Sequence, residues 1–166
     1  VECSNGAVVS AHPLASKVGV DIMKKGGNAF DAAIATQLTL AVVYPGAGNI
    51  GGGGFMVAFT EKGKTLALDY REKAPAAAGR DMYLDTKGNA QTNLSQSGHL
   101  ASGVPGSVAG LFSTHQYAKL PFKVLIQPAI DLAEKGFAIT ESEARSLNAA
   151  MGTFVQFSTK SNAFIK

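Results

Sequence analysis

Apolar residues near the start of the chain recur at helical spacing. Leu14, Val18 and Ile22 follow one another at intervals of four, so a helix through these positions has one apolar face. Residues 24–26, two lysines and a glycine, end this predicted helix, because lysines suit its negative C-terminal end and glycine is common just beyond it. The run at 7–10, which precedes the helix, predicts a short strand.

A second apolar stretch predicts a helix that lacks a polar face. Asn28 can cap its N-terminus, and Asp31 places a carboxylate in its first turn. The stretch continues to Val43, where Tyr44-Pro45 stops the helix. A helix that is apolar almost all round belongs at the centre of a core. We therefore expect this helix to be surrounded by the other elements.

Glycine is concentrated directly after this helix. Six glycines occupy positions 46–54, and two strand-like runs follow at 55–60 and 65–71. The residues between the two runs include Gly63, which suits a tight turn that needs a positive φ. The pattern predicts a β-hairpin that begins where the glycine loop ends.

The turn type sets the register of this predicted hairpin. A two-residue turn at 62–63 places Phe55 opposite Tyr70 and Gly54 opposite Arg71. The sequence therefore predicts that the glycine loop and an arginine are neighbours.

The remainder of the chain predicts a long loop and three short helices. Residues 75–106 carry repeated turn signals. The helical patterns that follow cover residues 107–119, 122–135 and 141–150. Pro121, Gly136 and Gly152 mark their boundaries. No repeat or linker divides the chain, so residues 1–166 are expected to form a single domain.

Composition removes several classes of function. The 15 lysines and arginines against 12 acidic residues give a net charge of +3, and the positive residues are scattered, which argues against nucleic-acid binding. The longest apolar run is shorter than the roughly 20 residues of a membrane span, so we expect no span. Cys3 has no cysteine partner, and three isolated histidines offer no metal cluster. We expect neither a metal nor a cofactor.

The glycine loop has two competing interpretations. Phosphate-binding loops run from strand through glycines to helix, whereas this stretch runs from helix through glycines to strand, and the lysine of a P-loop is absent. The alternative is that glycines at 51–54 let one backbone approach another closely, at the entropic cost that each glycine carries. We favour this second interpretation, in which the glycine backbone lies close to another backbone in the protein core or close to a substrate.

Several longer segments resemble one family. The chain contains, in order, GAVVSAHPLAS, GGNAFDAAIATQLTLAVVYPGAGNIGGGGFM, LDYREKAP, HLASGVPGSVAG and QPAIDLAEKGF. In sequence and order these segments resemble the γ-glutamyltransferases, or γ-glutamyl transpeptidases, of the N-terminal nucleophile hydrolase superfamily. The resemblance covers nearly the whole chain.

The resemblance implies a fold and an activity. The fold is an α+β four-layer αββα sandwich, of which residues 1–166 would be the N-terminal, incomplete part of the large subunit. A precursor of this family cuts itself, and the small subunit then begins with a threonine that is nucleophile and, through its own amine, base. It transfers the γ-glutamyl group of glutathione or related amides to water or an amino acid. The resemblance implies no cofactor, and a periplasmic or secreted location.

Arg71, in DYREKAP, is the substrate-binding residue that the resemblance implies, as the arginine that holds the α-carboxylate of the γ-glutamyl group. A guanidinium presents a planar fork that can donate two parallel hydrogen bonds to a carboxylate. The alternative is a surface salt bridge to Asp69 or Glu72. Glu72 is also placed to steady the arginine.

The catalytic residues of the family are not expected within this chain. The nucleophile of the family lies downstream, in the small subunit, so we assign no catalytic residue here. Residues 113–115, Ser-Thr-His, are similar to the Thr-Thr-His start of that subunit, but they fall inside a predicted helix, so Thr114 is not expected to be the nucleophile. Cys3, His99 and His115 are expected to be ordinary polar positions, and Asp31 a helix-terminal charge.

Two alternative functions stay open. One is an acylase of the same fold that acts on another acyl group, such as a cephalosporin acylase or an enzyme that processes poly-γ-glutamate. A substrate without a free α-carboxylate would give Arg71 less to bind. The other is a binding module that keeps the fold without the chemistry.

Overall fold

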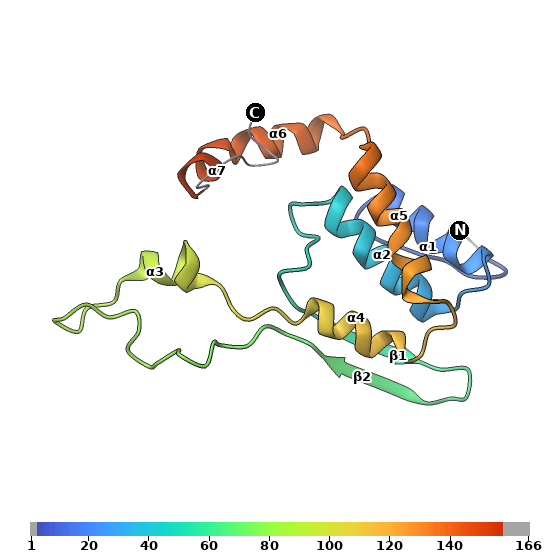
Figure 1. Ribbon diagram of the computed structural model, residues 1–166, viewed down its shortest axis with the longest axis horizontal. Helices are drawn as coiled ribbons and strands as arrows, with labels where there is room; N and C mark the ends of the chain where they lie inside the picture. Colours follow the sequence, from blue (N-terminus) through green and yellow to red (C-terminus); the bar gives the residue numbers. More distant parts are fainter. Residues whose placement is uncertain (1–2, 158–166) are drawn as a thin grey trace.

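The computed structural model describes residues 3–157. Its packed body is formed by three helices, α1 (Pro13–Lys24), α2 (Ala29–Val43) and α5 (Phe122–Lys135), and α2 lies between the other two (Figure 1). The helix α2 is buried on several sides, as its apolar composition predicts. The core cluster consists of Ile22, Ile34, Ala35, Leu38, Leu111, Leu125 and Ala129.

Both N-terminal helices begin with side-chain caps. His12 Nδ1 accepts the Leu14 N–H at the start of α1. Asn28 caps α2 as predicted, and Asp31 completes a capping box by accepting the Asn28 N–H at 2.8 Å. The helix ends at Val43, the predicted residue, because Tyr44 precedes a proline.

The predicted hairpin is present, but its predicted register is wrong by one residue. Strands β1 (Phe55–Phe59) and β2 (Thr65–Asp69) pair with Phe55 opposite Asp69. The loop holds three residues rather than two: Thr60 pairs with Lys64, and Gly63 has a φ of +74°. A three-residue loop of this kind ends in a left-handed residue, which glycine adopts without strain. Gly54 therefore pairs with Tyr70 instead of Arg71.

The strand predicted at 7–10 does not form. Within residues 3–157 this segment pairs with no other strand, and Val9 is 93% exposed. A strand pattern specifies which residues can pair but not whether a partner strand is available.

The predicted long loop is largely irregular. It contains the short helix α3 (Thr92–Gln96) and the 3-10 turn η1 (His99–Ala101), which the sequence did not predict. A bridge between Lys73 and Val104 closes the base of this segment. In Figure 1 the segment extends away from the helical body.

The helix α4 (Ser107–His115) lies along the hairpin (Figure 1) and ends four residues before the predicted boundary. The backbone N–H groups of Lys119 and Leu120 donate to the Asp31 carboxylate instead of to helical carbonyls. This long-range contact ends the helical run early.

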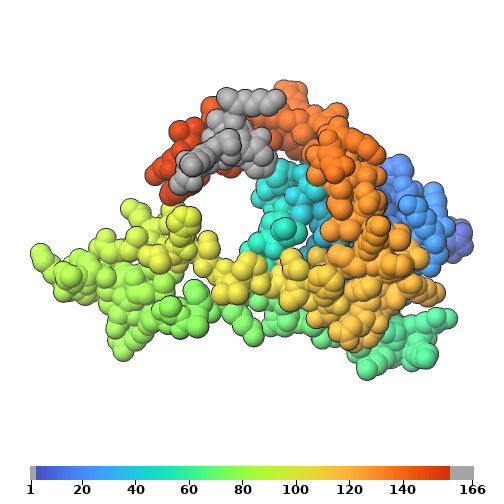
Figure 2. Space-filling model, viewed as in Figure 1, coloured from blue at the N-terminus to red at the C-terminus, as the bar shows by residue number. Residues whose placement is uncertain are grey.

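Helices α6 (Glu141–Ala149) and α7 (Met151–Phe157) follow α5 and form an arm that, in the view of Figure 2, ends above the extended segment. Gly136 ends α5 as predicted, with a φ of +78°. Gly152 does not end a helix but lies inside α7. A Cβ at this position would meet no neighbour within 4 Å among residues 3–157, so packing within that part of the chain does not require the glycine.

Candidate substrate-binding site

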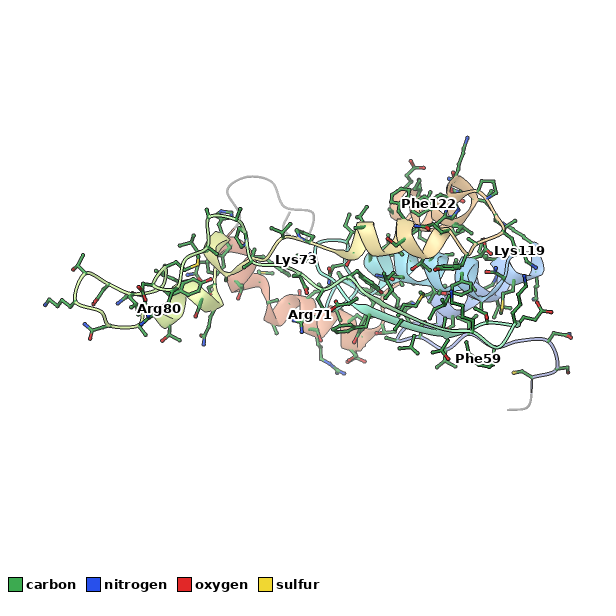
Figure 3. All side chains as sticks on the ribbon, turned by 90° about the horizontal axis from the view of Figure 1, so that it is seen from below. Phe59, Arg71, Lys73, Arg80, Lys119 and Phe122 are labelled. Atoms are coloured by element: carbon green, nitrogen blue, oxygen red, sulfur yellow. The ribbon has the colours of Figure 1, made fainter. Side chains whose placement is uncertain are left out.

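Arg71 lies just beyond β2, where the hairpin meets the extended segment (Figure 3). Its side chain is 64% exposed. The Nε atom lies 3.5 Å from Glu72 Oε2, and Cζ lies 6.0 Å from the centre of the Phe55 ring. Among residues 3–157, no side chain or backbone group accepts a hydrogen bond from the Nη atoms of Arg71. The part of the guanidinium fork that could bind a carboxylate is therefore available.

The two acidic neighbours of Arg71 act differently. Asp69 Oδ1 accepts the backbone N–H of Arg71 at 3.0 Å, so this carboxylate orders the main chain. Of the two carboxylates, it is Glu72 that contacts the guanidinium, and at 3.5 Å this exposed pair is long. The predicted alternative, a surface salt bridge, is thus present in a weak form that leaves most of the guanidinium unpaired.

The carboxylate of Glu72 is stabilised in its ionised form. Its own backbone N–H, the Arg71 guanidinium and the backbone N–H of Gly53 lower the pKa of Glu72 below its ordinary value, and partial desolvation opposes them. Glu72 is therefore negatively charged at neutral pH and can hold the Nε side of Arg71.

The glycine loop lies against the backbone that carries Arg71. A Cβ at Gly53 would lie 2.8 Å from Arg71 Cα and 2.7 Å from the Glu72 nitrogen, closer than real side-chain atoms approach. Gly54 exchanges two backbone hydrogen bonds with Tyr70, at 3.0 and 3.4 Å. The predicted proximity of glycine loop and arginine is confirmed at the main chain, although the residue pairs differ. Glycine is required here because the two backbones touch.

The glycine loop uses part of the N-terminus of α4 for its own backbone. The N-terminus of α4 faces the loop, and two of its N–H groups are already used. Gly106 N and Ser107 N both donate to the Gly52 carbonyl oxygen, at 2.8 and 2.9 Å. A helix N-terminus binds anions through such groups only when they are free.

Sequence reasoning missed the part that Tyr70 plays. Its ring packs against Gly54 at the start of the hairpin and against Gly110 in α4, and its carbonyl oxygen lies against Gly106. The available signal was the spacing of Gly106 and Gly110, four residues apart and therefore on one side of a helix. The sequence alone does not say which side chain that glycine face receives.

A groove of about 490 Å³ runs beside this assembly. It lies between the end of β2 with the segment that follows it and the start of α4. Its lining residues are Leu68, Asp69, Tyr70, Arg71, Glu72, Lys73, Val104, Pro105, Gly106, Ala109, Gly110 and Ser113. Arg71 therefore contributes to the wall of a groove rather than to a flat surface.

The Thr114 hydroxyl and the Asp31 carboxylate both have structural roles. Thr114 lies inside α4, is buried, and its hydroxyl donates to the Gly110 carbonyl at 2.8 Å. Asp31 is fully buried and accepts backbone hydrogen bonds from Asn28, Lys119 and Leu120. Its expected role as a helix-terminal charge is confirmed, and it also fixes the 119–120 loop.

The remaining sulfur and imidazole groups do not gather at the groove. Cys3 is free and exposed, and His115 Nε2 contacts the Leu120 carbonyl oxygen at 2.9 Å. His99 lies in η1, on the extended segment. In the described part of the chain, His, Cys, Asp and Glu side chains form no group of three or more that could hold a metal ion. None of the helices in residues 3–157 is both long and apolar enough to cross a bilayer.

Comparison with known proteins identifies relatives over nearly the whole chain. The family model described as gamma-glutamyltranspeptidase matches residues 15–166. The glutathione hydrolase proenzyme of a Pseudomonas species is 51% identical over 148 residues, which are 89% of this chain and 26% of that protein. The chain thus spans about a quarter of the length of this curated relative.

Solved structures show the same fold. The gamma-glutamyltranspeptidase of Helicobacter pylori superimposes with a TM-score of 0.93 at 44% identity, over 100% of this chain and 49% of that one. A cephalosporin acylase from Bacillus halodurans superimposes with a TM-score of 0.81 at 31% identity, over 96% of this chain and 30% of that one.

These comparisons confirm the fold class and the family that the sequence segments indicated. The fold is the α+β fold of the N-terminal nucleophile hydrolases, and the chain is an incomplete portion of it. Residues 3–157 contribute helices and one antiparallel hairpin to its four-layer αββα sandwich. The chain belongs to the gamma-glutamyltranspeptidase family.

Proposed function

We propose that the complete protein transfers or hydrolyses the γ-glutamyl group of glutathione-like amides, and that Arg71 binds the α-carboxylate of the donor. The observation that carries this proposal is the guanidinium of Arg71, whose Nη atoms have no hydrogen-bond partner among residues 3–157 and which lines a groove. A bidentate contact between this fork and a carboxylate would fix the γ-glutamyl group at one end. The amide at its other end then lies at a defined distance from the Arg71 guanidinium, which we call the carboxylate clamp.

The chemistry proposed for the complete protein follows from the family. The hydroxyl of an N-terminal threonine, outside this chain, attacks the γ-carbonyl carbon, and its own amine takes up the proton. The amine leaving group departs with a proton, and a γ-glutamyl ester stays on the threonine. Water or an amino acid then attacks the ester and releases the enzyme. Residues 1–166 contribute binding rather than the nucleophile.

The proposal includes a partner and a location. The chain is the N-terminal portion of a large subunit, and the small subunit arises from the same precursor. The proenzyme name of the Pseudomonas relative supports a precursor of this kind. A periplasmic or secreted location is proposed on the resemblance to bacterial members of the family.

A second candidate activity is that of an acylase with a different acyl group. The structural similarity to a cephalosporin acylase favours keeping it. The two activities differ in their need for an α-carboxylate on the substrate, and therefore in their dependence on Arg71.

The test is to express the complete gene product, to follow self-cleavage into two polypeptides on a gel, and to assay γ-glutamyl-p-nitroanilide. Wild type should cleave and turn over this donor, and Arg71→Ala should cleave normally but raise KM by about 10- to 100-fold, the loss of a charged hydrogen-bonded contact.

The matched control is Arg80→Ala. Arg80 is an arginine of the extended segment, far from Arg71 in Figure 3, and its side chain is 95% exposed. This variant should leave KM unchanged. A precursor that cleaves but whose KM is the same in Arg71→Ala and wild type would refute the role of Arg71. A protein that neither cleaves nor turns over the donor would refute the activity itself.

A further inference from the structure

We propose that Tyr70 is a positioning residue for Arg71, and that Gly110 of α4 provides the surface on which its ring is seated. This inference rests on the proposed function, because it assigns how the carboxylate clamp is held in place. It concerns neighbouring residues that come from the hairpin and from a helix about forty residues later in the chain.

The ring of Tyr70 is held between two glycines. A Cβ at Gly110 would overlap Cγ and Cδ2 of the ring, and one at Gly54 would lie 2.9 Å from Cε2. Any side chain larger than hydrogen at either position would displace the ring. The ring therefore touches the helix at its base and the start of the hairpin at its edge.

The main chain of Tyr70 is fixed as firmly as its ring. Its N–H and carbonyl oxygen both pair with Gly54, and the same carbonyl oxygen lies directly against Gly106. The next residue is Arg71, whose Cα lies against Gly53. The backbone that carries the Arg71 side chain is thus held between the glycine loop and the N-terminal end of α4.

Ordinary core packing does not account for this arrangement. Tyr70 is only partly buried, and it is not part of the core cluster around Ile34 and Leu38. Its hydroxyl lies 3.5 Å from Gln37 Oε1, at the outer limit of a hydrogen bond. The contacts that fix the ring are those with the two glycines, and they lie beside the arginine that lines the groove.

The consequence is a coupling between α4 and the clamp. If the ring is pushed away from Gly110, the backbone of Tyr70 must move with it. The end of the strand then moves too, because the N–H and the carbonyl oxygen of Tyr70 are both hydrogen-bonded to Gly54. A displacement of about 1 Å in a substrate-positioning group can cost up to 100-fold in rate. Recognition of the α-carboxylate should then be lost selectively.

The test measures a preference rather than a rate. In the complete protein, kcat/KM is determined for γ-glutamyl-p-nitroanilide and for its analogue with an α-carboxamide in place of the α-carboxylate. General damage to the enzyme lowers both values equally and leaves their ratio unchanged. Gly110→Ala and Tyr70→Leu should each lower the ratio by about 10-fold or more, whereas Tyr70→Phe, which keeps the ring, should retain it.

A helix control and a double-variant test complete the design. Gly152→Ala, in α7, adds a methyl group at a helical glycine that has no neighbour within 4 Å in the described part of the chain, and should leave the ratio unchanged. In the Arg71→Ala background, Gly110→Ala should cause no further loss of preference, because both changes remove the same contact.

The outcomes separate this inference from the proposed function. If Arg71→Ala itself retains the preference, the assignment of Arg71 as the clamp is wrong. If Arg71→Ala abolishes the preference but Gly110→Ala and Tyr70→Leu retain it, the clamp stands and the positioning role is overturned. Should Gly110→Ala fail to fold, Tyr70→Leu decides alone, since leucine is smaller than the ring and introduces no new overlap.

Discussion

At the scale of single residues, Arg71 combines exposure of its fork with a fixed backbone. Asp69 binds its N–H, Glu72 contacts its Nε, and Gly53 lies against its Cα. Each of these contacts orders the residue without occupying the Nη atoms. If Arg71 binds the carboxylate as proposed, its backbone is already ordered when the ligand arrives, which favours affinity.

The geometry of the guanidinium should matter as well as its charge. Arg71→Lys keeps the positive charge but presents a point charge instead of a planar fork. We expect KM for γ-glutamyl-p-nitroanilide to rise to a value between those of wild type and Arg71→Ala, with normal self-cleavage. A lysine variant with the KM of wild type would show that charge alone suffices.

At the scale of elements, Asp31 connects the start of α2 to the loop between α4 and α5. Its carboxylate is fully buried and accepts the N–H groups of Asn28, Lys119 and Leu120. The carboxylate is buried and its donors are partly buried, so its removal leaves these N–H groups without their acceptor.

Asp31→Ala should therefore destabilise the complete protein by about 3 kcal/mol, the cost of losing several hydrogen bonds to one charged, buried acceptor. The measurement is the denaturation midpoint followed by circular dichroism. Asp21→Ala is the control, since Asp21 forms a surface ion pair with Lys17 on α1 and its side chain is 41% exposed. Equal midpoints for the two variants would contradict the role of Asp31.

The cap of α6 should show a pH dependence of known sign. The backbone N–H of Thr140, its hydroxyl and His12 lower the pKa of Glu143 below its ordinary value of 4.5. The charged form thus stabilises the folded state above pH 4.5, and this contribution is lost as the pH falls through the lowered pKa.

Glu143→Gln tests this sign, because glutamine keeps the shape of the capping box without the charge. We expect the Tm of wild type to exceed that of the variant at neutral pH, and the difference to shrink below pH 4.5. A difference in Tm that is the same at pH 5 and pH 3 would contradict the assignment.

The elements that sequence alone predicts well are those with local signals. Asn28 and the Tyr44-Pro45 pair fix both ends of α2 because a cap and a proline act on adjacent backbone. The hairpin register was missed because one extra loop residue shifts every pair. The early end of α4 depends on Asp31, which lies about ninety residues before it in the chain. The position of the Tyr70 ring depends on Gly110, about forty residues later. Local sequence patterns do not reveal contacts over such separations.

The role proposed for Arg71 rests on the resemblance to the family and not on the hydrophobic pattern of the sequence. Its residue type and position after a strand do not distinguish a clamp from a surface ion pair. The structure adds that its fork is unpaired and that a groove lies beside it.

At the scale of the whole molecule, the hairpin has an open apolar face. Phe55, Val57 and Phe59 alternate on this face and are 63, 78 and 76% exposed. The chain spans about a quarter of its Pseudomonas relative, and the family fold contains a second sheet. We expect the rest of the complete protein to cover this face.

Val57→Asp in the complete precursor should therefore place a charge in a covered interface, at a high desolvation cost. We expect most of the self-cleaved product to be lost, measured as the two bands on a gel. Lys62→Asp, in the hairpin turn, should cleave normally. Normal cleavage of Val57→Asp would mean that the face stays open to solvent.

The most direct test of the account is the preference of the complete enzyme for a donor with an α-carboxylate over the α-carboxamide analogue, measured as a ratio of kcat/KM values in wild type and Arg71→Ala. We expect a preference of about 10- to 100-fold in wild type, and a ratio close to one in Arg71→Ala. A preference that survives unchanged in Arg71→Ala would contradict it.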